Sequence, residues 1–364
     1  MKWGEGSWSD PAFFPIGVWL QSPANAERYK KAGINTYIAL WKGPTEEQME
    51  TLRRAGMRLV CSQNKFALQH LDDPLILGWM HGDEPDNAQE LPDKKGYGPP
   101  VAPEKIVADY QRIKKEDPSR PVILNLGQGV AWDAWYGRGV RSKHPEDYPK
   151  YVEGCDIASF DIYPAVHDHP DVAGKLWRVA EGVKRLREWA GPRRSTWDCL
   201  ECTRIGNPDR KPTPAEVRAE AWMSLIHGSQ GLIYFVHQFK PTFREAALLD
   251  DPEMLAAVTA LNAQITGLAR VINSPERPDI VCHSEPVSAP VPVAVTTRKQ
   301  AGATYVFAVC MRDASTKATF QLKHWSGTKR VEVLDEGRTL AGGNGSFQDD
   351  FGPWQVHLYR LDSE

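Results

Sequence analysis

The stretch Trp79-Met-His-Gly-Asp-Glu-Pro-Asp86 closes an apolar run that begins at Ile76 and turns polar at its end. A second stretch, Trp197-Asp-Cys-Leu-Glu-Cys-Thr203, stops in the same way at Glu201. Short apolar runs that end in a carboxylate are typical of parallel strands whose carboxyl ends open into a shared cleft. We therefore expect Glu84 and Glu201, far apart in the sequence, to lie at the same end of one sheet.

On both sides of these two stretches, the first 274 residues alternate strand-like and helix-like segments, the pattern that favours a parallel sheet. Glu84 stands on the fourth strand-like run and Glu201 on the seventh. Eight such runs indicate a closed (β/α)8 TIM barrel rather than an open sheet. The runs are Phe14–Leu20, Ile34–Leu40, Met57–Gln63, Ile76–Glu84, Pro121–Leu126, Ile157–Tyr163, Ser195–Glu201 and Leu232–His237.

The segments between the runs carry helix start signals and uneven loops. Thr45 with Gln48, and Thr213 with Glu216, have the spacing of capping boxes. The turns that lead from helix to strand are short, whereas several loops from strand to helix are long. Long loops at one end of a barrel build its active-site face. The long loops are Asp86–Ala102, Gln128–Pro149, Ile205–Lys211 and Gln238–Asp250.

The character of the sequence changes after Ser274. Residues 275–364 show no helical period, and glycine, aspartate and asparagine turns separate short strand-like runs. We predict a small C-terminal antiparallel β-sandwich over residues 275–364, packed against a catalytic barrel over residues 1–274. The expected strands are Val291–Thr297, Thr304–Met311, Ala318–Leu322, Arg330–Leu334 and Trp354–Leu361.

Composition sets limits on partners and compartment. The 44 basic and 47 acidic residues leave a net charge of −3, which favours no nucleic acid or other polyanion as a partner. No apolar run approaches the ~20 residues that span a bilayer, so no membrane partner is expected. Residues 1–8 lack the apolar core of a signal peptide. Removal of a signal from a secreted precursor stays possible, so the compartment is left open.

Cysteine and histidine motifs in the sequence do not favour a metal or a cofactor. The six cysteines lie mostly in apolar runs, which predicts buried free thiols. Cys199 and Cys202 form a Cys-x-x-Cys, but residues three apart on a strand point to opposite faces and make a poor zinc or redox pair. His167-Asp-His169 lies in a proline-rich loop without a further ligand set. We expect no cofactor and no metal.

The strand-end glutamates resemble those of glycoside hydrolase clan A, the 4/7 superfamily of (β/α)8-barrel retaining β-glycosidases. In that clan Asn-Glu-Pro ends strand four, and this chain has Asp83-Glu84-Pro85. The resemblance implies that Glu84 is the acid/base and Glu201 the nucleophile. It also implies that Tyr163, at the end of strand six, donates a hydrogen bond to Glu201. Asp83 departs from the asparagine of the clan, and so does Leu40-Trp41-Lys42 from the arginine that often ends strand two.

The chemistry of two carboxylates supports the same function. In a retaining glycosidase one carboxylate attacks the anomeric carbon and the other protonates the departing oxygen, with the two about 5–5.5 Å apart. The acid needs a raised pKa, for which burial and the neighbouring Asp83 are sources. We therefore predict an enzyme, a retaining glycoside hydrolase that cleaves β-glycosidic bonds of an oligosaccharide, polysaccharide or glycoside.

Aromatic and polar residues at the same end complete the predicted sugar site. Thirteen tryptophans are many for this length, and Trp and Tyr rings stack on the C–H faces of sugars. The loop after the fifth strand is densest in them, with Trp132, Trp135 and Tyr136. The predicted substrate-binding residues are Asp83, Tyr163, Trp41, Asn125, Trp132, Trp135 and Gln238, with Gln21, Gln63, Asn64 and His237 as weaker candidates.

Two other functions stay open from the sequence. One is a non-catalytic carbohydrate-binding barrel, which the replacement at Asp83 favours. The other is a metal-dependent barrel enzyme in which Asp83, Glu84, Asp161 and Glu201 form a carboxylate cage, although no histidine pair accompanies them. The sequence does not indicate the sugar, the linkage, exo or endo action, or the oligomeric state.

Overall fold

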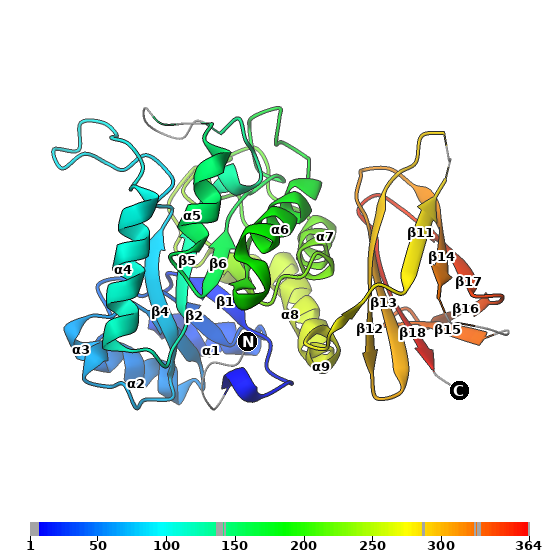
Figure 1. The fold of residues 1–364 in the computed structure, drawn as a ribbon, viewed down its shortest axis with the longest axis horizontal. Helices are drawn as coiled ribbons and strands as arrows, with labels where there is room; N and C mark the ends of the chain where they lie inside the picture. Colours follow the sequence, from blue (N-terminus) through cyan, green and yellow to red (C-terminus); the bar gives the residue numbers. More distant parts are fainter. Residues whose placement is uncertain are drawn as a thin grey trace.

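Parallel strands at the centre of the amino-terminal part form a barrel that helices surround (Figure 1). The computed structural model describes residues 7–135, 141, 143–285, 288–323, 325 and 329–362. The barrel strands are β1 (Ile16–Trp19), β2 (Thr36–Ile38), β3 (Arg58–Cys61), β4 (Ile76–Asp83), β5 (Val122–Leu126), β6 (Ile157–Phe160), β7 (Ser195–Thr196), β8 (Asp198–Glu201) and β9 (Leu232–Phe235).

The barrel closes through its seventh strand, which consists of two pieces. β7 pairs with β6, and β8 pairs with β9, which in turn pairs with β1; every pairing is parallel. The two pieces are separated only by Trp197, and an isolated bridge between Asp161 and Cys199 continues the contact with the sixth strand. Each of the eight predicted runs therefore contains one barrel strand, and the predicted barrel fold is confirmed.

Helices follow the barrel strands in alternation, as expected. The two predicted capping boxes are present, because Thr45 and Thr213 each accept a hydrogen bond from the backbone three residues later and receive the reciprocal bond. The α-helices are α1 (Ala26–Lys31), α2 (Glu46–Arg54), α3 (Lys65–Leu68), α4 (Pro103–Glu116), α5 (Tyr148–Val152), α6 (Trp177–Ala190), α7 (Pro214–Ile226), α8 (Pro252–Gly267) and α9 (Ala269–Ile272). Short 3-10 turns are η1 (Ser7–Ser9), η2 (Pro23–Asn25), η3 (Gln128–Val130), η4 (Pro145–Asp147), η5 (Gly191–Arg193) and η6 (Ala247–Asp250).

Trp197 fills the centre of the barrel. Its fully buried ring belongs to an apolar cluster with Ile38 of β2, Val60 of β3 and Cys199 of β8. Gly231 makes room for this ring, since a Cβ there would come within 2.5 Å of the indole. A large ring at the point where β7 gives way to β8 explains why the seventh strand is interrupted, and the filled interior leaves the strand ends as the place for a site.

The carboxy-terminal part consists of two antiparallel sheets, which confirms the predicted β-sandwich. One sheet has the order β10-β12-β13-β18-β15-β16 and the other the order β11-β14-β17. Four of these strands were not predicted from the sequence, namely β10, β11, β16 and β17. They are short or rich in polar residues, as in Ser346–Phe351, so their pattern is closer to that of a turn. The strands are β10 (Glu276–Arg277), β11 (Ile280–Ser284), β12 (Val293–Gln300), β13 (Ala303–Cys310), β14 (Thr316–Leu322), β15 (Lys329–Val333), β16 (Arg338–Gly342), β17 (Ser346–Phe351) and β18 (Val356–Asp362).

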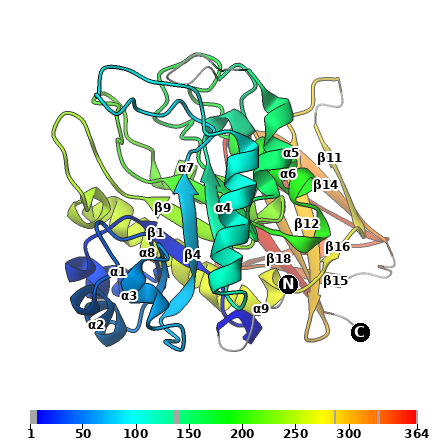
Figure 2. The same ribbon diagram turned by 60° about the vertical axis from the view of Figure 1, so that its left-hand side comes forward.

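The sandwich lies beside α6, α7 and α8 rather than at the strand ends of the barrel (Figures 1 and 2). The Trp222 ring of α7 contacts Phe307 of β13, with 5.0 Å between ring centroids, and both rings belong to one apolar cluster. Because that contact buries apolar surface of both parts, the two hold each other in place. We keep the division into residues 1–274 and 275–364 as a proposal.

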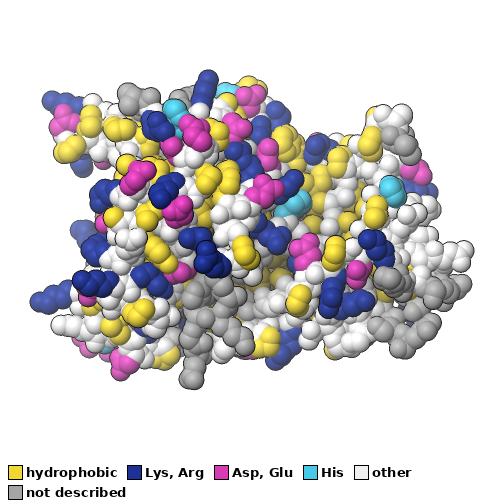
Figure 3. Space-filling model, viewed as in Figure 1, with side chains coloured by type: hydrophobic (Ala, Val, Ile, Leu, Met, Phe, Trp, Pro, Cys, Tyr) yellow, Lys and Arg dark blue, Asp and Glu magenta, His cyan; other side chains and the backbone are white. Residues whose placement is uncertain are grey.

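The surface and the thiols agree with the sequence. All six cysteines are free, and every one except Cys282 is buried. On the face drawn in Figure 3, acidic and basic side chains are interspersed rather than gathered by sign. Among the helices in the described ranges, none is both long enough and apolar enough to cross a membrane.

Candidate active site

A cleft of about 990 Å³ opens at the carboxyl ends of the barrel strands. The long loops gather at this end, at the top of the barrel in Figure 1. Four carboxylates line the cleft: Asp83, Glu84, Asp161 and Glu245. They come from the ends of β4 and β6 and from the loop after β9. A cleft of this size with several convergent acids is typical of an active site that binds a small molecule or part of a polymer.

Glu84 is held in the cleft by an unusual backbone conformation. Its φ angle is +43°, in the left-handed region that residues other than glycine rarely adopt. Its backbone N–H donates to the carbonyl of Asn125 at 2.9 Å, which fixes the turn at the end of β4. Successive strand residues normally face opposite ways, yet Asp83 and Glu84 both line the cleft. Strained backbone of this kind is common at functional sites.

The Glu84 carboxyl group holds a proton more firmly than a free glutamate does. Burial raises its pKa to about 7, and the carboxylates of Asp83 and Asp86 add to the rise. Hydrogen bonds with Asn87 and Asp161 oppose it only in part. Near neutral pH a substantial fraction of Glu84 therefore carries a proton, as a general acid must.

Asp161 forms a carboxyl pair with Glu84. Their side chains are hydrogen-bonded, and two carboxyl groups can share such a bond only when one of them holds a proton. Burial and the Glu84 carboxylate together raise the pKa of Asp161 well above its ordinary value. The sequence interpretation considered Asp161 only as a metal ligand. Its position one residue past β6 was the available signal, because that is the barrel end where Glu84 lies.

Asp83 and Asn125 form a second polar pair in the cleft. The Asn125 side-chain amide donates to Asp83 Oδ1 at 3.0 Å, and its oxygen accepts from the Ser159 hydroxyl at 2.8 Å. Asn125 is buried, whereas Asp83 is exposed to the cleft. The two residues come from the neighbouring strands β4 and β5 and hold each other in one orientation.

Glu201 requires a correction to the predicted geometry. It ends β8 as expected, but it is fully buried and does not line the cleft. Its two carboxylate oxygens accept the backbone N–H groups of Ala165 and Val166 at 2.5 and 2.9 Å, and the buried Glu220 of α7 interacts with it. Ala165 and Val166 belong to the loop after β6, so the carboxylate points toward that loop and does not line the cleft that Glu84 lines.

Cys199 stands in the cleft where the sequence had led us to expect Glu201. The Tyr163 hydroxyl donates to the Cys199 sulfur at 3.6 Å, not to Glu201 as predicted. Both residues line the cleft. Burial raises the pKa of the Cys199 thiol well above its ordinary value, with Asp161 adding to the rise. The thiol therefore stays protonated and is a poor nucleophile.

The aromatic predictions divide between the cleft and the core. Trp41 and Trp135 line the cleft, and the Trp135 indole N–H donates to Asn87 at 2.6 Å. Trp132 is only 3% exposed and packs against Trp135 and His169. It was predicted to lie at the sugar site, but the structure places it in the core. The loop turns Trp132 inward because the apolar cluster around β5, β6 and α6 takes up its ring. Tyr136 lies outside the described residues.

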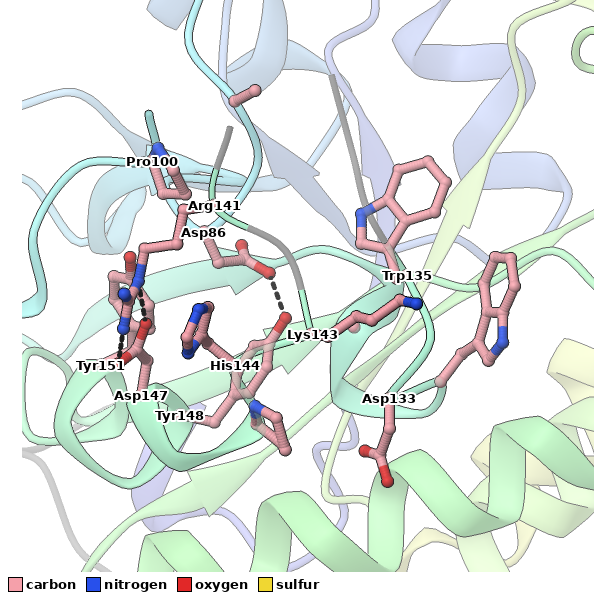
Figure 4. A pocket seen from close by; sticks show the side chains of 14 residues that line it. Asp86, Pro100, Asp133, Trp135, Arg141, Lys143, His144, Asp147, Tyr148 and Tyr151 are labelled. Atoms are coloured by element: carbon pink, nitrogen blue, oxygen red, sulfur yellow. Dashed lines mark hydrogen bonds and ion pairs between the residues drawn. The ribbon is translucent and has the colours of Figure 1, made fainter. Parts of the chain in front are cut away.

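The loop that carries Trp135 is tied to the barrel through Asp86. The Tyr148 hydroxyl of α5 donates to Asp86 Oδ2 at 2.8 Å, as the close-up in Figure 4 shows. The Gly127 backbone N–H donates to the same carboxylate. Trp135 lies in the same view, close to this contact (Figure 4). The Asp86 carboxylate thus links the loop after β4 to the loop after β5.

Of the polar residues predicted to bind substrate, some line the cleft and others lie outside it. Gln21 and His237 line the cleft and are 3.2 Å apart. Gln238 does not line it, because its side chain donates to the carbonyl of Thr242 within its own loop. Gln63 and Asn64 are likewise outside it, the latter capping α3. Sequence reasoning missed the cleft residues Asn87, Gln128, His167, Phe235, Phe239, Phe243 and Glu245.

Trp135 and Trp132 provide a matched pair of tests. The Trp135→Ala variant should weaken substrate binding several-fold, because loss of ring stacking costs on the order of 1 kcal/mol, while its stability stays close to that of the parent. The Trp132→Ala variant should instead lose about 3–5 kcal/mol of stability, since it empties a buried site. KM and urea unfolding midpoints measure the two effects. The reverse pattern would place the substrate against Trp132.

No metal site emerges from the described residues. Within those ranges, no group of three or more His, Cys, Asp or Glu side chains is arranged to hold a metal ion.

Comparison with known proteins identifies relatives by structure alone. No family model and no curated protein matches the sequence. An α-amylase from Geobacillus thermoleovorans, complexed with acarbose, superposes over 100% of both chains with a TM-score of 0.56 and 12% identity. The chain has the fold of glycoside hydrolases.

Two further structures are similar. One is a family 39 glycoside hydrolase from Bacteroides cellulosilyticus, covering 98% of this chain and 82% of that one, with a TM-score of 0.56 and 12% identity. The other is a family 30 subfamily 8 xylanase from Clostridium acetobutylicum, with 96% of both chains covered, a TM-score of 0.50 and 9% identity. At such low identity the likeness extends to the fold and not to individual residues.

Proposed function

We propose that this protein is a glycoside hydrolase whose general acid is Glu84. The observation that carries the proposal is a partly buried glutamate with a pKa of about 7 in a cleft at the strand ends of a (β/α)8 barrel. Three further carboxylates line the same cleft: Asp83, Asp161 and Glu245. The shared fold of the amylase and the xylanase supports this class of chemistry.

Glu84 has the properties that the first step of the reaction needs. As the glycosidic C–O bond breaks, the proton of Glu84 moves to the departing oxygen, and the sugar develops positive charge at its anomeric carbon. Glu84 is then a carboxylate and can take a proton from the water that completes hydrolysis. Asp161 keeps the acid oriented through their shared hydrogen bond, and the anionic groups around it stabilise the cationic sugar.

The second carboxylate of a retaining mechanism is proposed to be either Glu201 or one of the acids that line the cleft. The clan A resemblance favours Glu201, which would have to leave its two backbone donors and turn toward the cleft. The cleft itself offers Asp83 and Asp161. Asp161 is paired with Glu84, which makes it a positioning partner of the acid rather than a separate nucleophile. Asp83 is exposed to the cleft and has no such tie to Glu84. Within glycoside hydrolysis, we propose cleavage of β-linkages with retention of the anomeric configuration.

A substrate panel tests the function directly. Aryl α- and β-glycosides of glucose, galactose, xylose, mannose and glucuronic acid should include at least one that is hydrolysed, and the activity should survive a strong chelator. Product anomers followed by NMR would show retention or inversion. Loss of activity with the chelator would favour the metal-dependent barrel enzyme instead. No hydrolysis across aryl glycosides and oligosaccharides would overturn the proposal.

A non-catalytic carbohydrate-binding barrel is a second candidate, and the place of Cys199 favours it. A protonated thiol beside Tyr163 occupies the cleft, while Glu201 is enclosed. Such a protein would bind sugars without turning them over. Calorimetric titration with oligosaccharides that the panel shows to be uncleaved distinguishes this candidate from a glycosidase that acts on another sugar.

A further inference from the structure

One wall of the cleft is a continuous strip of aromatic rings. It begins at Tyr163, which interacts with Asp161, and continues to Phe235 with 5.4 Å between ring centroids. From Phe235 it reaches His237 at 5.0 Å and Phe239 at 6.1 Å. Phe243 lies 5.9 Å from Phe239. The strip thus leads from the carboxyl pair to the outer part of the cleft.

The outer end of the strip exposes apolar surface to solvent. Phe239 is 50% and Phe243 63% exposed, although large apolar side chains in a soluble protein are usually covered. Their loop is well fixed, because Gln238 and Arg244 exchange two backbone hydrogen bonds and the Phe239 N–H donates to Ile205. The two rings are therefore presented at fixed positions before any ligand arrives.

The part of the cleft around the carboxyl pair is polar. Asp83, Glu84, Asn125, Gln128 and Asp161 all line it. A sugar ring carries hydroxyl groups around its edge and needs such donors and acceptors. Phenylalanine rings provide none, unlike tryptophan and tyrosine, which combine a flat face with a polar group. The polar residues of the exposed loop, Lys240, Thr242 and Arg244, do not line the cleft.

We propose that the three phenylalanines of the strip, Phe235, Phe239 and Phe243, form an aglycone subsite. This subsite selects glycosides whose leaving group is apolar, such as an aryl group. The inference rests on the proposed function, because the carboxyl pair defines where the sugar ends and the leaving group begins. The glycosyl unit binds among the polar residues, and the leaving group extends along the rings. Covering the two exposed phenylalanines then adds to binding.

Uncleavable thioglycosides test this subsite without turnover. Phenyl and methyl 1-thioglycosides of the five panel sugars are titrated while tryptophan fluorescence is followed, since Trp41 and Trp135 line the cleft. The parent protein should bind the phenyl compound of at least one sugar about tenfold more tightly than its methyl counterpart. The Phe239→Ala and Phe243→Ala variants should lose most of that preference and leave methyl binding unchanged.

A Tyr97→Ala variant is the control, because Tyr97 is 40% exposed and does not line the cleft. It should keep the full phenyl preference. Equal loss of phenyl and methyl binding in the phenylalanine variants would overturn the proposal, because the strip would then bind the sugar itself. So would an unchanged preference, or no preference in the parent. If no panel substrate were hydrolysed but the phenyl preference were present, the proposed hydrolase activity would be wrong and the apolar binding subsite would still stand.

Discussion

The Glu84→Gln variant should lose roughly 10²- to 10⁴-fold in kcat/KM on glycosides with poor leaving groups, the range typical of a general acid. Activated aryl glycosides should lose far less, because their leaving groups depart without a proton. The rate of the parent should fall as pH rises through about 7, since the pKa of Glu84 lies there and its protonated form is the active one. That alkaline limb should vanish in the variant.

Glu90→Gln is the matched control for this experiment. Glu90 lies in the same loop after β4, is exposed and does not line the cleft. Its substitution should leave kcat/KM and the pH profile unchanged. If Glu84→Gln hydrolysed both kinds of glycoside at the parent rate, Glu84 would not be the general acid.

The Glu201→Ala variant should be the most destabilised of the carboxylate variants. It leaves the N–H groups of Ala165 and Val166 buried without a partner, and each such group costs about 1–3 kcal/mol, so the total is roughly 2–6 kcal/mol. Urea unfolding midpoints, compared with those of the exposed-site variant Glu188→Ala, measure the effect.

The same variant decides the mechanism. If Glu201 is only structural, the variant protein is destabilised, and added azide does not restore its activity. A nucleophile gives a stable, inactive protein whose turnover of aryl glycosides returns with azide or formate. The second result would reinstate the sequence-based role of Glu201 and show that its side chain reaches the cleft during catalysis. Asp83→Ala and Asp161→Ala, treated in the same way, test the cleft carboxylates on either side of Glu84 in the sequence.

The barrel was predictable because its signals are local. Eight apolar runs, two threonine capping boxes and the change of pattern after Ser274 each depend on neighbours in the sequence. The same reasoning placed Glu84 at the end of β4 and Glu201 at the end of β8, and the structure has them there. The position of a strand follows from the spacing of apolar residues, which can be read directly from the sequence.

Side-chain direction at a strand end was not predictable, because it depends on contacts between distant segments. A left-handed φ turns Glu84 into the cleft beside Asp83. Two backbone N–H groups after β6 draw Glu201 away from it, and Cys199 takes its place beside Tyr163. The barrel, the sandwich and the end at which the acids gather all follow from the local pattern of the chain. Which acids face one another depends on tertiary contacts, since strand periodicity no longer governs orientation where a strand ends and loops supply the hydrogen bonds.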